Sequence, residues 1–229
     1  MKAMILAAGR GERMRPLTDH TPKPLLEAGG KPLIVWQIER LVAAGISEIV
    51  VNCAWLAHQL QAALGDGRRF NARLHWSVEA KALETAGGIA RALPLLGSEP
   101  FLVVNGDIWC DWDFGRAASC AQHMKQGGAL AWLLMVDNPA HHPEGDFELN
   151  DSGQLGQRMN NGRSFTFSGI GVYDPQLFAA LDPAQRAPLA PLLRGAMARR
   201  QVIGEHYKGM WMDIGTPERL RTLDEHLKQ

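Results

Sequence analysis

Residues 2–18 of the chain read KAMILAAGRGERMRPLT. The apolar run from Lys2 to Ala7 stops at Gly9, which is typical of a short buried strand that ends in a loop. Downstream, Pro32 is a suitable first residue for a helix whose apolar side chains recur at helical spacing as far as Gly45. A strand, a loop and a helix in this order form the first unit of an α/β fold.

The same order repeats along the chain, and after Asp113 it changes to a more mixed pattern. We therefore expect one Rossmann-like domain over residues 1–229, with a mixed and mainly parallel sheet flanked by helices. The predicted strands are 48–52, 72–79, 101–105, 129–136, a hairpin at 147–150 that turns at 151–153, and 164–173; the predicted helices are 55–64, 88–96, one after 113, 189–199 and 216–227.

The composition excludes several classes of protein. The 24 Lys and Arg residues balance 24 Asp and Glu residues, so the chain lacks the basic surface of a nucleic-acid-binding protein. The longest uncharged apolar stretch, residues 129–136, is far too short to cross a membrane. The three cysteines include no C-x-x-C pair, which fits a reducing compartment. We expect a cytoplasmic protein that binds neither nucleic acid nor membrane.

Ligands of open α/β sheets bind beyond the carboxyl ends of the strands, so the loops there are the candidate sites. The loop after the first strand carries glycines, whose backbone N–H groups can approach an anion, and arginines that suit phosphate. Met14 occupies the third glycine position of a dinucleotide-binding motif, and no P-loop motif occurs, so both of those folds are disfavoured. A surface turn with solvated arginines is the alternative.

Three further residues suit a phosphate and metal site. Lys23 lies between two prolines, which restrict the backbone and so direct the ammonium. Asp107 follows the strand at 101–105, and Asp213 follows another short apolar run. Two carboxylates, substrate phosphates and water form the usual Mg²⁺ shell. An exposed lysine and two helix-capping or turn aspartates are the alternatives.

His141 and His142 are adjacent, and their side chains would point apart in an extended loop. We therefore expect no zinc there, only a polar loop or a substrate contact.

Together, residues 6–18, Pro22-Lys23-Pro24, Asn105-Gly106-Asp107 and residues 211–216 resemble the sugar-1-phosphate nucleotidylyltransferase family. The resemblance implies a nucleotide-diphospho-sugar transferase (GT-A-like) fold. It also implies Mg²⁺-dependent transfer of a nucleotidyl group from an NTP to a sugar 1-phosphate, with release of pyrophosphate. The implied partners are these small molecules, and the implied assembly is a monomer or a small homo-oligomer.

The resemblance assigns a role to each matching residue. Arg13 would contact the triphosphate and Lys23 the reacting phosphate, with Asp107 as the third catalytic residue; Asp107 and Asp213 would bind the metal. The residues implied to contact the nucleotide are Leu6, Ala7, Ala8, Gly9, Gly11, Glu79, Glu84, Thr85, Gly87 and Asn105, and those implied to line the sugar site are Gly145, Phe167 (through its backbone) and Ser168, with His141 and His142 beside them.

Substrate choice is less strongly indicated. Residues 137–147 and the compact end after residue 216 most resemble family members that use UTP and N-acetylmuramic acid 1-phosphate in cell-wall sugar recycling. We expect no C-terminal β-helical domain of the kind that larger family members carry. His141 or His142 would then read the lactyl carboxylate of that sugar. Glu79 stands where relatives place a base-reading glutamine; a carboxylate there accepts the ring N–H of uracil or guanine. Residues 186–192 lack the acidic segment of thymidylyltransferases.

Two alternatives stay open. A mannose-1-phosphate guanylyltransferase is compatible with Glu79 and with residues 85–87. A catalytically silent sugar-nucleotide sensor would keep the fold but would be expected to lose a metal ligand or the loop arginine, whereas Arg13, Lys23, Asp107 and Asp213 are all present.

Overall fold

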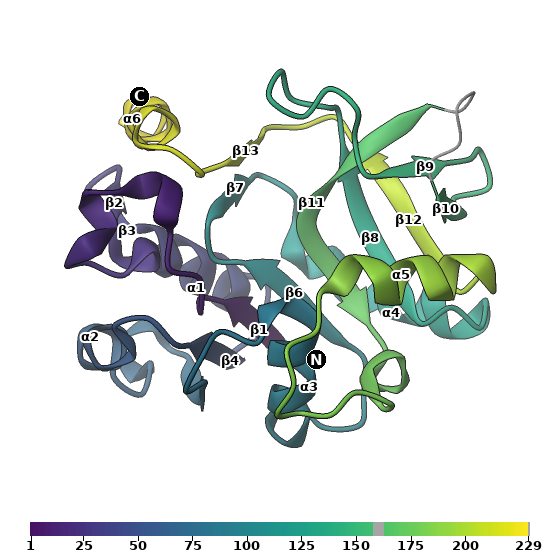
Figure 1. Cartoon of the computed structure of the whole chain (residues 1–229), viewed down its shortest axis with the longest axis horizontal. Coiled ribbons are helices and arrows are strands. Elements are labelled where there is room, and N and C mark those ends of the chain that lie inside the picture. Colours follow the sequence, from purple (N-terminus) through teal and green to yellow (C-terminus); the bar gives the residue numbers. More distant parts are fainter. Residues whose placement is uncertain (158–162, 229) are drawn as a thin grey trace.

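The computed structural model describes residues 1–157 and 163–228. A sheet that has nine strands in this part of the chain runs through the centre of the molecule (Figure 1). Its first half is parallel, in the order β5, β4, β1, β6. The bounds are Ala3–Leu6 for β1, Glu48–Cys53 for β4, Arg73–Val78 for β5 and Phe101–Asn105 for β6.

The second half of the sheet is mixed. The long strand β11 (Ser164–Tyr173) runs antiparallel to β6 on one edge and to β8 (Ala131–Val136) on the other. Strand β12 (Val202–Tyr207) is parallel to β8. Strands β9 (Phe147–Leu149) and β10 (Leu155–Gln157) form the predicted hairpin, and β9 pairs with the start of β11. The predicted mixed sheet flanked by helices is therefore confirmed.

Helices cover both faces of the sheet because successive strand residues point to opposite sides. Ile5 packs in a core cluster with α1 (Leu33–Ala43), α2 (Ala57–Leu64) and α4 (Ala117–Gln126). Its neighbour Met4 packs in a second cluster, with α3 (Glu84–Leu96) and α5 (Leu189–Ala198). Both side chains are completely buried.

A smaller unit lies beside the carboxyl edge of the parallel strands. Strands β2 (Glu27–Ala28) and β3 (Lys31–Pro32) form a short ribbon, and β7 (Ile108–Cys110) pairs with β13 (Trp211–Asp213). The last helix, α6 (Pro217–Leu227), lies next to β2 (Figure 1). These segments share a third apolar cluster: Met14, Leu26, Ala28, Leu33, Ile214 and Leu223.

Most predicted elements are confirmed within a few residues, with three kinds of difference. Strands β2, β3, β7, β12 and β13 were not predicted. All but β12 are too short to show a period, and β12 carries Gly204, Glu205 and His206. Pro32 precedes α1 as its cap, and α3 begins at Glu84. Short 3₁₀ helices occupy Glu12–Met14, Leu17–Asp19, Lys23–Leu25, Arg68–Phe70, Phe114–Arg116 and Pro175–Phe178.

Helices of the described residues are all too short, or not apolar enough, to cross a bilayer.

The burial of α1 predicts a matched pair of stability effects. Leu41 of α1 is completely buried, whereas Leu17 is 43% exposed. We expect Leu41→Ala to lower the free energy of unfolding by about 2–5 kcal/mol, because it removes buried apolar atoms and leaves a cavity. Leu17→Ala is expected to change it by about 0.5 kcal/mol or less. Denaturant titration measures both values, and equal losses would contradict the core assignment.

Candidate active site

The candidate active site is a cleft at the carboxyl ends of β1 and β6. It consists of two adjoining pockets, of about 320 and 370 Å³, which both include Asn105 and Asp107. Gly106, between these residues, lies against β1: its N–H donates to the carbonyl of Leu6 at 2.9 Å, and a Cβ there would lie 2.7 Å from the same oxygen. The Gly-Asp pair that follows β6 therefore brings the Asp107 carboxylate beside the end of β1.

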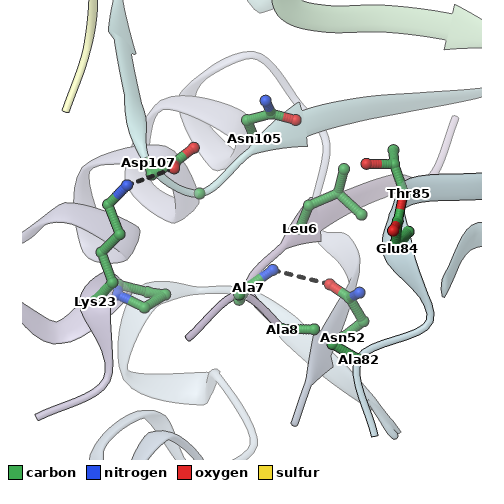
Figure 2. A pocket seen from close by; sticks show the side chains of 13 residues that line it. Leu6, Ala7, Ala8, Lys23, Asn52, Ala82, Glu84, Thr85, Asn105 and Asp107 are labelled. Carbon is green, nitrogen blue, oxygen red and sulfur yellow. Dashed lines mark hydrogen bonds and ion pairs between the residues drawn. The ribbon is translucent and has the colours of Figure 1, made fainter. Parts of the chain in front are cut away.

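Lys23 and Asp107 form an ion pair between the two pockets. Nζ of Lys23 lies 2.5 Å from Oδ2 of Asp107 (Figure 2). The lysine side chain is only 9% exposed and the aspartate side chain 42%. Gly11, in the left-handed region at φ +70°, contacts the stem of the lysine: a Cβ there would lie 3.2 Å from Cβ of Lys23. The ammonium is thus largely withdrawn from water and held in one position.

The second metal candidate, Asp213, ends β13. Register and hydrogen bonding place it next to the Asp107 segment: Asp213 is opposite Ile108, and the N–H of Ile214 donates to the carbonyl of Asp107 at 2.8 Å. Its Oδ1 accepts from Nη1 of Arg219, in the first turn of α6. The same Nη1 lies 2.8 Å from Nε2 of His141. Since a guanidinium only donates, Arg219 bridges the carboxylate and the imidazole.

Arg13 faces the same pocket as Asp213. A Cβ on Gly215 would lie 2.9 Å from Oδ2 of Asp213 and 3.2 Å from Nη2 of Arg13, so the absence of a side chain there leaves room for both groups. The other loop arginines turn elsewhere: Arg10 stacks on Trp55 with its Cζ 3.6 Å from the ring centroid, and Arg15 pairs with acidic neighbours.

The donor set fits a magnesium ion better than zinc. Asp107, just before β7, and Asp213, at the end of the paired strand β13, line one pocket, and two carboxylates completed by substrate phosphates and water are what Mg²⁺ prefers. In residues 1–157 and 163–228, no group of three or more His, Cys, Asp and Glu side chains is placed to hold a metal. His141 and His142 have different partners, because Nε2 of His142 lies 3.1 Å from Oδ1 of Asp146.

One wall of the second pocket comes from β11. Phe167 and Ser168 line it, together with Trp211 of β13. The backbone N–H of Phe167 donates to Oδ2 of Asp146 at 2.8 Å, and the carbonyl of Ser168 accepts from Nε1 of Trp211 at 2.8 Å. Asp146 therefore links His142 to the backbone of β11, and fixes the imidazole at the rim of the pocket.

The first pocket is formed by the predicted loop and by the start of α3. Leu6, Ala7, Ala8 and Gly9 line it on one side, and Glu84 and Thr85 on another (Figure 2). Glu84 has a φ of +59°, unusual for a residue with a side chain, and its carboxylate lies 2.6 Å from Nη2 of Arg186. Ala7, Ala8, Gly9, Ala82 and Gly106 have small side chains or none, which leaves the backbone open to a ligand at these points of the lining.

Comparison with known proteins decides the family. Residues 2–229 match the Nucleotidyl transferase family model. The chain belongs to this family. It is 52% identical over 222 residues to the N-acetylmuramate alpha-1-phosphate uridylyltransferase of Neisseria meningitidis, a match that covers 96% of each chain. The predicted sugar-1-phosphate nucleotidylyltransferase resemblance is thereby confirmed.

More distant relatives agree with the family. The chain is 32% identical over 228 residues to the mannose-1-phosphate guanylyltransferase catalytic subunit beta of Xenopus tropicalis, a match that covers 95% of this chain and 62% of the relative. A solved structure of a putative glucose-1-phosphate thymidylyltransferase from Bacillus anthracis superposes with a TM-score of 0.84, at 22% identity, over 100% of this chain and 96% of the other. The second likeness confirms the fold.

Four residues predicted to contact ligands are not among those that line the two pockets of this nucleotidyltransferase, and their ligand contacts stay predictions. Gly11 packs on the Lys23 stem, as above. Gly87 donates its N–H to the carbonyl of Ala187, where a side chain would collide with the backbone. Gly145 packs against Asn138 and the backbone of Phe165. These three are small because protein packs against them, and none of them lines the cleft.

Glu79 is the fourth of these residues. It is only 3% exposed, and both carboxylate oxygens accept hydrogen bonds inside the protein: Oε1 from Nδ2 of Asn52 at 2.7 Å, and Oε2 from the N–H of Leu83 at 2.8 Å. Its carboxylate is thus held by the protein, and its contact with the base stays a prediction.

Sequence reasoning missed one residue that lines the cleft and two that hold its lining residues in place. Asn52 lines the first pocket and, like Asn105, lies at the carboxyl end of a parallel strand, so the strand-end rule could have found it. Arg219 and Asp146 contact lining residues of the second pocket, and they had no comparable signal because these partners are far away in the sequence.

Proposed function

We propose that this nucleotidyltransferase transfers the uridylyl group of UTP to N-acetylmuramic acid 1-phosphate and releases pyrophosphate, in the recycling of cell-wall sugars. The observation that carries the proposal is the 52% identity, over 96% of both chains, to the Neisseria meningitidis protein of that name. The two adjoining pockets support it, since they share Asn105 and Asp107 and so offer places for two substrates side by side.

The arrangement of the pockets assigns a place to each substrate. The nucleotide would lie over residues 6–9 and beside Thr85, and the sugar against β11 and Trp211. The reacting phosphates would then meet where the pockets join, at Asn105 and Asp107. An oxygen of the sugar 1-phosphate attacks the α-phosphorus, the new P–O bond forms, and the bond from the α-phosphorus to the β-phosphate oxygen breaks.

This chemistry needs little acid–base catalysis. The attacking phosphate is already ionised, so the main tasks are to align two anions and to neutralise their charge. Lys23 suits this role because its ammonium is held in place and poorly hydrated, so its interaction with a phosphate is weakly screened. Arg13 would add a planar donor to the triphosphate.

Asp107 and Asp213 would hold Mg²⁺. When bound, the ion would supply positive charge to the phosphates and stabilise the charge of the departing pyrophosphate. The two carboxylates are already oriented by Lys23 and by Arg219 respectively.

The sugar pocket offers a site for the lactyl carboxylate of the muramic acid. His141 and His142 line this pocket, and Arg219 lies 2.8 Å from His141. Nitrogen donors of this kind at the rim would favour a sugar with a carboxylate over a neutral one.

We also infer that the reaction takes place in the cytoplasm. Cys53, Cys110 and Cys120 are free and buried, and cysteines without disulfides are typical of proteins in a reducing compartment. Burial raises the pKa of each thiol to about 11, so these cysteines are inert thiols and not nucleophiles.

A turnover screen tests the function. Pyrophosphate release is measured with UTP, GTP and dTTP, each paired with N-acetylmuramic acid, N-acetylglucosamine, glucose and mannose 1-phosphates, with Mg²⁺. We expect the highest kcat/KM with UTP and the muramyl substrate. A preference for GTP with mannose 1-phosphate would support the alternative that the Xenopus relative suggests, and tight UDP-sugar binding without turnover would indicate a sensor.

Removal of the central charges should reduce turnover. Lys23→Ala and Asp107→Ala are each expected to lower kcat by about 100- to 1000-fold, since each removes a preorganised electrostatic partner of the phosphates. Lys125→Ala is the matched control, because this lysine pairs with Glu99 on the surface. Near-normal pyrophosphate release by either active-site variant would show that the roles are wrong.

The histidine pair should determine the sugar. A His141→Ala, His142→Ala double variant is expected to lose most of the preference for the muramyl substrate over N-acetylglucosamine 1-phosphate, measured as the ratio of kcat/KM values. Its activity with the neutral sugar should change little. His123→Ala, outside the cleft, serves as the control, and an unchanged ratio in the double variant would remove the histidines from sugar recognition.

A further inference from the structure

We propose that Asn52 and Glu79 form a chain of hydrogen bonds, here called the relay, in which only one arrangement of donors and acceptors is possible. We propose further that this relay holds the two walls of the nucleotide pocket in position. Glu79 is in this view a positioning residue that acts through Asn52 and Ala7. The inference rests on the proposed function in one respect, namely that the pocket lined by Ala7 and Asn52 receives the nucleotide.

The relay joins two walls of that pocket. The N–H of Ala7, the first residue beyond β1, donates to Oδ1 of Asn52 at 2.8 Å (Figure 2). Nδ2 of Asn52 donates to Oε1 of Glu79 at 2.7 Å, and Oε2 of Glu79 accepts from the N–H of Leu83 at 2.8 Å. Leu83 caps α3, whose first residues line the opposite wall. The relay thus spans from the loop after β1 to the start of α3.

The direction of the relay follows from its two ends. Both ends are backbone N–H groups, which can only donate. Asn52 meets the first with its carbonyl oxygen, so its NH₂ group must face residue 79. The side chain at position 79 then meets a donor on each side, from Asn52 and from Leu83. An ionised carboxylate accepts from both, whereas glutamine would turn its own NH₂ group toward one of them.

Burial makes a mismatch costly. Asn52 and Glu79 are each 3% exposed. Helix α3 closes over them at Gly88, where a Cβ would lie 2.8 Å from Oε1 of Glu79 and 2.9 Å from Nδ2 of Asn52. Water has little room to satisfy a donor that has lost its acceptor, so two opposed donors would move apart and shift Ala7 or Leu83.

The same logic identifies a pair of substitutions that reverses the hydrogen bond between positions 52 and 79 and keeps the two outer ones. In an Asn52→Asp, Glu79→Gln double variant, the carboxylate introduced at position 52 accepts from Ala7 and from the glutamine NH₂ group, and the glutamine oxygen accepts from Leu83. Every donor again has an acceptor, and the net charge is unchanged. Asn52→Asp alone would place two carboxylates against each other at the 2.7 Å contact.

The test compares wild type, each single variant and the double variant. UTP binding is measured by calorimetry, and KM is measured separately for UTP and for the sugar 1-phosphate. We expect each single variant to bind UTP about tenfold more weakly or worse, with the KM of the sugar phosphate within about twofold of wild type. The double variant should return to within about threefold of wild type. Glu99→Gln, at an exposed ion pair, is the matched control.

The outcomes separate the possible failures. Normal UTP affinity in Glu79→Gln, or a double variant no better than the singles, overturns the relay. A loss of thermal stability with unchanged UTP affinity shows a merely structural pair and also overturns it. If Glu79→Gln does not fold, the double variant decides: recovery of folding and UTP binding supports the relay, and failure refutes it. Wild-type protein that binds no UTP would instead overturn the proposed function.

Discussion

A small apolar cluster determines where the charges of the cleft lie. Met14, Leu26 and Ile214 are buried together with side chains of α1 and α6. Met14 follows Arg13, Leu26 follows the turn that carries Lys23, and Ile214 follows Asp213. Burial of these apolar neighbours brings three segments, from both ends of the chain, to the carboxyl edge of the sheet. The burial of apolar surface offsets the conformational entropy that these charged loops lose when they become ordered.

Within that frame, four of the charged groups of the cleft form ion pairs. Lys23 is paired with Asp107, and Arg219 with Asp213 and His141. Such pairs at a partly buried site hold the side chains in place more than they stabilise the fold, because desolvation offsets much of the attraction. The cleft is therefore preorganised: cations and carboxylates alternate where a sugar phosphate and a nucleotide would meet, and reorganisation on binding would be small.

Much of the fold and part of the site could be predicted from the sequence. Periodicity located the long buried elements. The rule that ligands bind beyond the carboxyl ends of strands pointed to the loop after the first strand and to Asp107, and the two flanking prolines pointed to Lys23; Ala8, Gly9, Lys23 and Asp107 all line one pocket. Short or polar strands such as β7 and β12 were missed because their order comes from pairing with a distant strand. The glycines at 11, 87 and 145 were predicted to contact ligands, and in the structure protein packs closely around each of them.

The sequence by itself determined the order of the long strands and helices, the family, and the loop that lines the first pocket, because local period and motif spacing encode them. Only the tertiary structure decided which way a side chain at the end of a strand turns. Glu79 is an acidic residue in a segment predicted to face a ligand, yet its side chain is buried. It accepts hydrogen bonds from Asn52, on a strand distant in sequence, and from the N–H of Leu83, where the chain turns into α3. The orientation of such a side chain depends on the hydrogen-bond partners that the folded chain brings to it, and the local sequence pattern does not specify these partners.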